Sequence, residues 1–378
     1  MKILHIYKDY YPVLGGIENH IRSLAESQVK VGHRVTVLVC HPERHSRVTE
    51  IQGVRVILMG RWTTVASMPI SPGLPLILQR LCPDLIHVHS PFPLGELAAW
   101  MGKPRVPLVL TYHADVVRQK WLMRIYSPLF WIVLRLARRI IVTNPPMIES
   151  SRWLRPLRAK CEVVPLGIDV SRFSPVPIRL AGPVLNLLCV GRLRYYKGLD
   201  TLLRALATVR TARLVVVGNG PMRRPWEQLA RDLGVQDRVE FVGDIPESEL
   251  SDYYRKADLF VLPANARAEA FGTVFLEAMA SGLPCIATEL GTGTSWVVQH
   301  ERTGLVIPPG DVAALIRALE RMQSAEDRQR WGRAGRARVH SVFTESLMTE
   351  GVLRVYEHVM NRAPADPAVM PYDGIREK

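Results

Sequence analysis

One pattern occurs twice along this chain: an apolar strand, a turn that carries glycine, a helix and a second apolar strand. In the first copy the strands are expected at residues 3–7 and 35–40, and Gly15 and Gly16 supply the turn ahead of the helix. The second copy begins with a strand at 185–190. Strands joined by a crossover helix lie parallel in one sheet, and the helices cover its faces. The pattern therefore predicts an α/β protein with two such sheets.

The length of 378 residues is enough for two domains that each bury a core of their own. A proline-containing run at 172–177 is typical of a hinge between domains. We therefore expect a first domain over residues 1–170 and a second over 178–343. Residues 361–378 contain proline and few apolar side chains, so we expect a disordered tail there.

Basic charge is concentrated in the first half of the chain. The whole chain has 49 Lys and Arg against 35 Asp and Glu, a net charge of +14. Residues 1–170 hold 22 basic and 11 acidic residues, a net charge of +11. One basic half indicates an anionic neighbour such as a membrane surface, a lipid phosphate or an acidic glycan. Nucleic acid is disfavoured as a partner, because no aromatic-basic motif or reader module occurs.

The remaining composition indicates a cytoplasmic protein. The five cysteines are scattered and mostly lie in apolar runs, which fits neither a disulfide framework nor a zinc spacing. No run of 18 uncharged apolar residues occurs, so a membrane-spanning helix is not expected. The first residues form a strand followed by charged residues, unlike a signal peptide.

Residues 116–139 combine aromatic and aliphatic side chains with several arginines. Pro128 is expected to break any single helix here. Two interpretations stay open: a segment that contacts an anionic membrane surface from the cytoplasmic face, and a core helix with a solvated end. The charge of the first half slightly favours the membrane contact.

Glu269 and Glu277 stand eight positions apart on either side of a Phe-Gly-Thr turn. Gly272 lets the backbone approach a ligand closely, and a short helix is expected from Thr273 to Ser281. The N-terminus of a helix attracts phosphate, and a carboxylate beside it can accept hydrogen bonds from sugar hydroxyls. This combination is suited to a nucleotide sugar.

A second candidate phosphate site follows the strand at 185–190. Arg192 and Lys197 would place two cations at the carboxyl end of that strand, where they can neutralise a diphosphate. Gly-Arg, four residues and Lys-Gly, together with the Glu269–Glu277 spacing, resemble the motifs of the retaining glycosyltransferases of family 4, which have the GT-B fold. A Pro-Leu-Gly-Ile-Asp phrase at 165–169 is also typical of that family, and the likeness covers about residues 1–360.

The resemblance implies two Rossmann-like domains that face each other across a deep cleft. The first domain would bind the acceptor, the second would bind the nucleotide sugar, and a helix at 344–360 would pack back onto the first domain. The family pattern implies catalytic roles for Glu269, Arg192, Lys197 and His113, with His113 contacting the donor sugar. It implies donor-binding roles for Gly15, Gly16, Gly191, Gly220, Val242, Phe271, Gly272, Thr273, Val274 and Glu277, where Glu277 would hold the ribose.

Metal is not expected to take part. No Asp-x-Asp pair occurs, so leaving-group charge would be handled by Arg192, Lys197 and helix dipoles. His87 and His89 lie on one face of a predicted strand, but no third ligand accompanies them in the sequence. Retention follows from the resemblance, and a same-face attack, in which the departing phosphate accepts the acceptor's proton, is the mechanism we favour.

The expected activity is transfer of a hexose from GDP-mannose or a UDP-hexose to a glycan or lipid-linked acceptor in envelope polysaccharide assembly. Two alternatives stay open. One is a sugar-nucleotide epimerase or phosphorylase of the same fold. The other is a non-catalytic protein that binds a sugar nucleotide.

Overall fold

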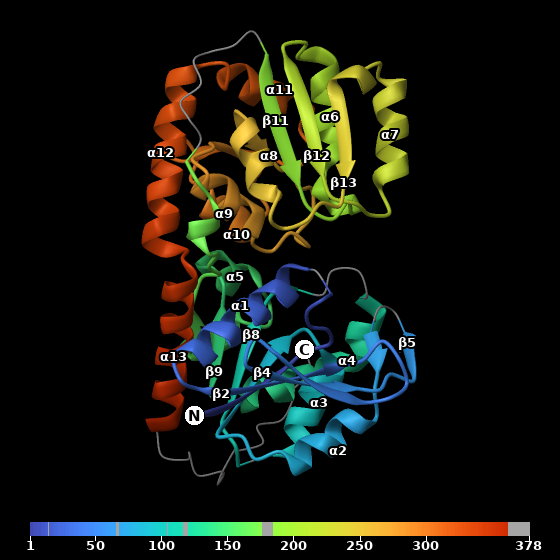
Figure 1. The fold of residues 1–378 in the computed structure, drawn as a ribbon, viewed down its shortest axis with the longest axis vertical. Helices are drawn as coiled ribbons and strands as arrows, with labels where there is room; N and C mark the ends of the chain where they lie inside the picture. Colours follow the sequence, from blue (N-terminus) through green and yellow to red (C-terminus); the bar gives the residue numbers. More distant parts are fainter. Residues whose placement is uncertain (14, 66–67, 104, 116–119, 176–183, 362–378) are drawn as a thin grey trace, which may run out of the picture.

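The structure is a computed structural model, and it describes residues 1–13, 15–65, 68–103, 105–115, 120–175 and 184–361. Two α/β units are stacked along the long axis of the molecule (Figure 1). The lower unit is built from the first half of the chain and the upper unit from the second half. The predicted tail at 361–378 lies outside the described residues except for its first position, and so do residues 176–177 of the proline-containing run.

The described part of the first half forms a sheet of eight strands in the order β10-β9-β8-β7-β1-β2-β4-β3. Neighbouring strands are parallel except β3 and β4, which are antiparallel. The strands are β1 (Lys2–Ile6), β2 (Arg34–Cys40), β3 (Arg47–Ile51), β4 (Val54–Met59), β7 (Leu85–Ser90), β8 (Leu108–Tyr112), β9 (Arg139–Val142) and β10 (Cys161–Val163); β5 (Thr63–Val65) and β6 (Met68–Ile70) form a separate pair. The helices are α1 (Gly16–Lys30), α2 (Gly73–Arg80), α3 (Pro93–Gly102), α4 (Lys120–Leu136) and α5 (Pro145–Ser150).

The described part of the second half forms a parallel sheet of six strands in the order β13-β12-β11-β14-β15-β16. The strands are β11 (Leu185–Val190), β12 (Ala212–Val217), β13 (Val239–Gly243), β14 (Leu259–Val261), β15 (Cys285–Thr288) and β16 (Gly304–Ile307). The helices are α6 (Leu199–Thr208), α7 (Arg223–Asp232), α8 (Leu250–Lys256), α9 (Thr273–Ala280), α10 (Gly293–Val297), α11 (Val312–Arg321) and α12 (Ala325–Val342). β1 is an interior strand of the first sheet, and β11 is an interior strand of the second. Later strands are added on either side of each, so the strand order reverses beside β1 and beside β11. Such reversals are where open α/β sheets bind ligands.

The last described helix belongs spatially to the first unit. α12 runs beside the upper unit and α13 (Glu345–Asn361) continues beside the lower one (Figure 1). α13 packs against α1 and β9, and its Val352 and Tyr356 are buried with Ile3 and Leu24. Glu345 at its start accepts hydrogen bonds from two serine hydroxyls of α1.

The structure corrects one expectation about residues 116–139 and answers part of the question that the sequence left open there. Pro128 does not break the helix but lies inside α4, which runs through it. Proline removes one backbone hydrogen bond and crowds the preceding turn, and the packing of the residues after Pro128 against the core offsets that cost. The side chains of Phe130, Val133 and Leu134 are buried in the core of the first unit. This part of residues 116–139 is therefore a core helix. Residues 116–119 lie outside the described residues.

Candidate functional site

An ion pair lies at the carboxyl end of β11. Lys197 Nζ is 2.7 Å from Glu269 Oε2, and both side chains are nearly buried, at 12% and 11% exposure. Burial lowers the pKa of Lys197, but the charge and the hydrogen bond of Glu269, with smaller contributions from Tyr196 and Cys189, together outweigh it. The pKa is therefore raised and the ammonium group is charged. Gly191 has φ of +136°, and a Cβ there would lie 3.2 Å from Nζ. Glycine therefore leaves the space that Lys197 occupies.

The glycine turn between the two carboxylates forms as expected. Gly272 has φ of +77° and is the N-cap residue of α9, and a Cβ there would lie 2.6 Å from the Phe275 ring. The helix ends as predicted, because Gly282 and Leu283 donate their N–H groups to the carbonyls of Met279 and Ala278. Thr273 and Val274 are half-buried in its first turn, and Phe271 is buried beneath it.

Glu277 projects from α9 one turn after Thr273 and accepts a 2.7 Å hydrogen bond from the Tyr254 hydroxyl. Burial raises the pKa of Glu277 to about 7, and the Tyr254 hydrogen bond and Arg172 oppose that shift. The carboxyl group therefore titrates near neutral pH. Tyr254 lies in α8 and belongs to none of the motifs, so its contact with Glu277 was not predicted from the sequence.

The glycine turn of the first unit faces the second. Gly15 is the N-cap residue of α1 with extended backbone, and a Cβ on it would overlap the Glu18 carboxylate; Gly16 has open space around it. Burial raises the pKa of Glu18, while Lys8, 4.0 Å away, and Arg192 lower it. Arg192 belongs to the second unit and is exposed. This electrostatic interaction joins the start of α1 in the first unit to Arg192, just after the end of β11, in the second.

His113 ends a chain of buried hydrogen bonds in the first unit. Its Nε2 is 3.0 Å from His89 Nδ1, His89 Nε2 is 3.0 Å from His5 Nδ1, and His5 Nε2 is 2.8 Å from Gln28 Oε1. Burial lowers the pKa of His113 and His89 well below the usual value, so both imidazoles are neutral at pH 7. The expectation that no third histidine accompanies His87 and His89 was wrong. His5 joins them, with ring nitrogens within 4.8 Å of one another, because β1 lies beside β7 in the sheet.

Two predicted donor-binding residues lie farther along the second sheet. Gly220 follows β12, and a Cβ there would overlap the backbone carbonyl of Leu193. Val242 is the half-buried penultimate residue of β13, which is at the edge of the sheet next to β12. Lys197 thus contacts Glu269, and Glu269 Oε1 would lie 3.8 Å from a Cβ on Gly272 at the start of α9. Among the described residues, no hydrogen bond or ion pair joins Gly220 or Val242 to these groups.

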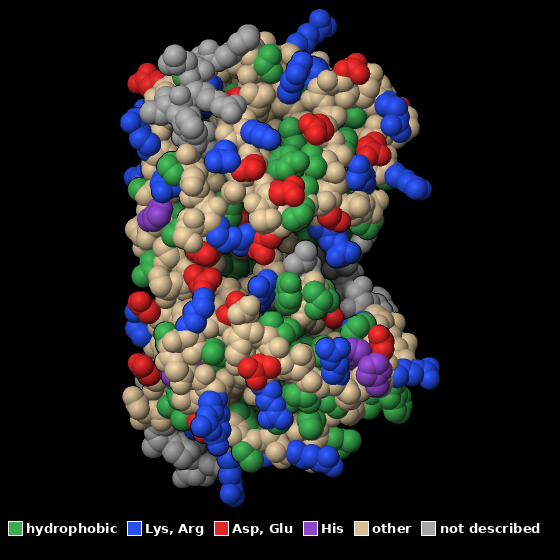
Figure 2. All heavy atoms as spheres, viewed as in Figure 1, with side chains coloured by type: hydrophobic (Ala, Val, Ile, Leu, Met, Phe, Trp, Pro, Cys, Tyr) green, Lys and Arg blue, Asp and Glu red, His purple; other side chains and the backbone are tan. Residues whose placement is uncertain are grey.

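The two units are joined beside this site by Arg267, which no motif indicated. Its guanidinium lies 3.3 Å from Asp115 and donates a 2.8 Å hydrogen bond to Ser150, both in the first unit. It also donates to the carbonyls of Leu290 and Gly291 in its own unit. In the space-filling view the outline of the molecule is indented between the two halves (Figure 2). The candidate site lies at this junction.

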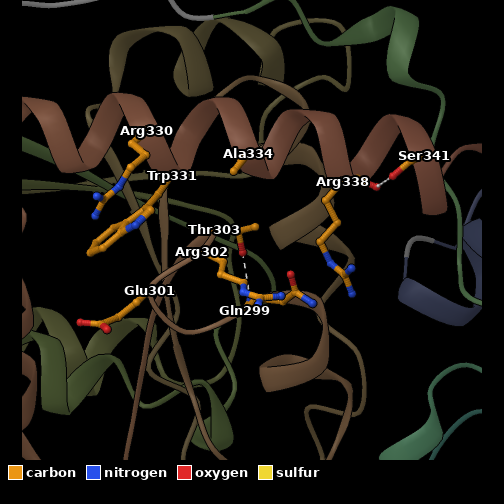
Figure 3. Close-up of a pocket in the computed structure, with 9 residues that line it drawn as sticks. All are labelled: Gln299, Glu301, Arg302, Thr303, Arg330, Trp331, Ala334, Arg338 and Ser341. Atoms are coloured by element: carbon orange, nitrogen blue, oxygen red, sulfur yellow. Dashed lines mark hydrogen bonds between the residues drawn. The ribbon is translucent and has the colours of Figure 1, made fainter.

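A separate pocket lies elsewhere on the second unit, between α12 and the turn before β16 (Figure 3). Arg330 in this pocket pairs with Asp327, and Arg338 donates to backbone carbonyls. Both arginines are thus engaged by groups outside the pocket lining, and none of the motif residues lines it. The pocket is therefore not the candidate site.

Comparisons with known proteins agree with this architecture. Residues 14–172 match the model described as glycosyltransferase family 4, and residues 179–338 match the model described as glycosyl transferases group 1. The chain is therefore a two-domain α/β transferase of the GT-B fold, and it belongs to glycosyltransferase family 4.

Curated relatives match over nearly the whole chain. The O-antigen chain mannosyltransferase C of Escherichia coli is 32% identical over 94% of this chain and 98% of its own length. The D-rhamnosyltransferase WbpZ of Pseudomonas aeruginosa is 34% identical over 91% and 92%. Among solved structures, the sucrose-phosphate synthase of Thermosynechococcus elongatus superposes with a TM-score of 0.79 at 25% identity, covering 95% of this chain and 98% of that one. The chain is thus an enzyme that transfers sugar.

Proposed function

We propose that this protein transfers mannose from GDP-mannose, with retention of configuration and without a metal on the diphosphate, to a growing glycan or lipid-linked acceptor of an envelope polysaccharide. The observation that carries the proposal is the nearly buried Lys197–Glu269 pair beside the Gly272 turn. A cation, a carboxylate and a helix N-terminus meet there, which are the groups needed by a phosphate and a sugar ring.

The choice of sugar is supported by the relatives. One is named for mannose and one for D-rhamnose, which is 6-deoxymannose, so both sugars carry the same axial 2-hydroxyl. Of the two donors expected from the sequence, GDP-mannose therefore has the stronger support. A UDP-hexose is the competing outcome of the test.

The proposed mechanism assigns charge stabilisation to this chain's own side chains. Lys197 and Arg192 hold the diphosphate, and the bond between its oxygen and the anomeric carbon breaks as negative charge develops on that oxygen. The acceptor hydroxyl attacks from the same face and passes its proton to the departing phosphate oxygen. Glu269 orients the sugar hydroxyls and Glu277 holds the ribose. His113 contacts the sugar from the first unit.

The proposed membrane contact is peripheral and electrostatic. Among the described residues no helix combines the length and apolarity needed to cross a bilayer. The net charge of +11 over residues 1–170 supports a peripheral contact with an anionic surface at the cytoplasmic face. Salt-sensitive sedimentation with anionic vesicles tests that contact, and sedimentation that does not respond to salt would contradict it.

The test of the function is thermal unfolding in EDTA with a panel of nucleotide sugars, followed by transfer assays with the donor that binds. A donor at 100 times its Kd stabilises the folded state by about 2.7 kcal/mol. We expect GDP-mannose to raise the midpoint and K197M to remove the effect. R330A, in the pocket on α12, is the matched control, and its unfolding midpoint should still rise with GDP-mannose. If no nucleotide sugar stabilises the protein, the proposed donor class is refuted. A strict need for added metal would refute metal independence, and a product of inverted configuration by NMR would refute retention.

The same experiment separates the two alternatives. An epimerase would convert the donor without an acceptor, which NMR of the donor alone detects. A non-catalytic binding protein would show the midpoint shift, yet no transfer or donor hydrolysis would follow.

A further inference from the structure

A group of three buried histidines lies in the first unit, and only one of them, His113, has a proposed role in sugar transfer. His20 comes from α1, His89 from β7, and His113 follows β8, so three separate elements supply them. Each offers a ring nitrogen within 4.8 Å of the others, and all three side chains are buried. The His20 ring stands edge-on to both partners, with ring centroids 5.7 Å from His89 and 5.2 Å from His113.

His20 is the unusual member of the group. It is 8% exposed, and neither of its ring nitrogens has a hydrogen-bond partner in the structure. A buried polar group without a partner costs about 1–3 kcal/mol, so such groups are rare. The two nitrogens of a neutral imidazole are one donor and one acceptor, and a ligand that takes the acceptor lone pair would remove part of that cost.

We propose that His20, His89 and His113 form a binding site for a divalent transition-metal ion, with Zn²⁺ as the best-suited ion. Three neutral imidazoles with an open fourth position are an established zinc donor set. Imidazole nitrogens suit Zn²⁺, Co²⁺, Ni²⁺ and Cu²⁺, whereas Mg²⁺ and Ca²⁺ prefer oxygen ligands. The site is therefore selective for the former class.

The distances require only a small adjustment. At a Zn–N distance of about 2.0–2.1 Å, the nitrogens of a tetrahedral site lie roughly 3.3 Å apart. His89 Nδ1 and His113 Nε2 are already 3.0 Å apart and share one proton. When the ring that carries this proton changes tautomer, so that the proton sits on its far nitrogen, both facing lone pairs are free for the ion and no proton is released. His20 must approach by a side-chain rotation.

Groups behind the site would hold one ligand in the required tautomer. With Nδ1 on the ion, His89 donates its Nε2–H to His5 Nδ1 at 3.0 Å, and His5 donates its own Nε2–H to Gln28 Oε1 at 2.8 Å. A ligand histidine whose second nitrogen donates to a fixed acceptor is the usual arrangement around bound metals. These hydrogen bonds fix the ring orientation and the tautomer of His89, which a chance cluster of histidines would leave unfixed.

The test uses the full chain without a histidine tag, stripped with a chelator and titrated with Zn²⁺ and with Co²⁺. We expect one ion per chain by calorimetry, and visible Co²⁺ bands typical of a tetrahedral nitrogen site. Loss of an outer partner costs 10–100-fold in metal affinity, so H20Q, which removes a direct ligand, should lower it by at least about 100-fold. H20C restores a thiolate ligand and should restore binding, with an added sulfur-to-cobalt band.

The matched control is a second, mostly exposed group, His41, Glu43 and His45. H41Q/H45Q should leave the stoichiometric site intact. Binding that disappears in this variant and persists in H20Q would overturn the proposal, as would the absence of stoichiometric binding in the unsubstituted chain. Unfolding midpoints of all three variants establish that each is folded. The readout is metal binding, so it does not depend on which sugar is transferred.

Discussion

Replacement of Lys197 by methionine removes one charge from a nearly buried pair and leaves the other. Glu269, at 11% exposure, would then be an uncompensated carboxylate. Breaking such a pair from one side costs about 3 kcal/mol, which for a domain of this size corresponds to a fall in Tm of roughly 6–12 °C. If Lys197 also stabilises the departing diphosphate, kcat falls by about 10²–10³, the cost of losing one donor to a developing charge.

The double variant separates these two effects. K197M/E269Q has neither charge, so its free energy of unfolding should recover to within about 1 kcal/mol of that of the unsubstituted protein, while kcat stays low. The assays are calorimetric unfolding and initial rates of transfer at saturating donor. A K197M enzyme that keeps more than a tenth of its kcat would refute the catalytic role. A double variant no more stable than K197M would refute the charge argument.

Three further outcomes are expected. The folded-state pKa of Glu277, about 7, lies above its ordinary value of 4.5, so its contribution to stability is complete below pH 4.5 and is lost as the pH rises through 7. E277Q should therefore lose less stability than the unsubstituted protein between pH 5 and 7.5. Urea unfolding across this range measures the loss, and an equal loss in both proteins would contradict the argument. G304A should cost about 3 kcal/mol, since its Cβ would overlap the Cys285 carbonyl, whereas G310A, with open space at φ of +73°, should cost about 1 kcal/mol. R267A removes the contacts to Asp115 and Ser150, so solution scattering without donor should give a larger radius of gyration, and an unchanged radius would argue against a joining role.

Much of the fold is predictable from the sequence because strand and helix periodicities agree with the glycine turns. The strands around residues 3–7, 35–40 and 185–190, and the helix that stops at Gly282, are where the structure has them. The antiparallel β3 was not predicted, since a partly exposed strand of five residues carries no continuous apolar run. The continuity of α4 through Pro128 depends on packing against the sheet, which a local rule does not include.

The site was predictable only to the extent that its residues stand in motifs. Lys197 and Glu269 were assigned separate roles, and the ion pair between them arises because β11 and β14 are neighbours in the sheet. Tyr254, Arg267 and His20 were missed for a common reason. Each contacts a partner that is distant in the sequence, Glu277 for Tyr254, Asp115 for Arg267 and His89 for His20, and no spacing rule connects the members of such a pair.

The return of α13 to the first unit has a consequence for biosynthesis. Val164 and Ile3 of the first unit share a buried cluster with Val352 and Tyr356 of this helix. On the ribosome the first unit emerges early, but its apolar flank stays uncovered until the whole second unit has been translated. At about 5–20 residues per second that interval is on the order of ten seconds or more. During it the nascent chain exposes a surface that chaperones bind, and stalled or shortened chains would be recognised as unfinished.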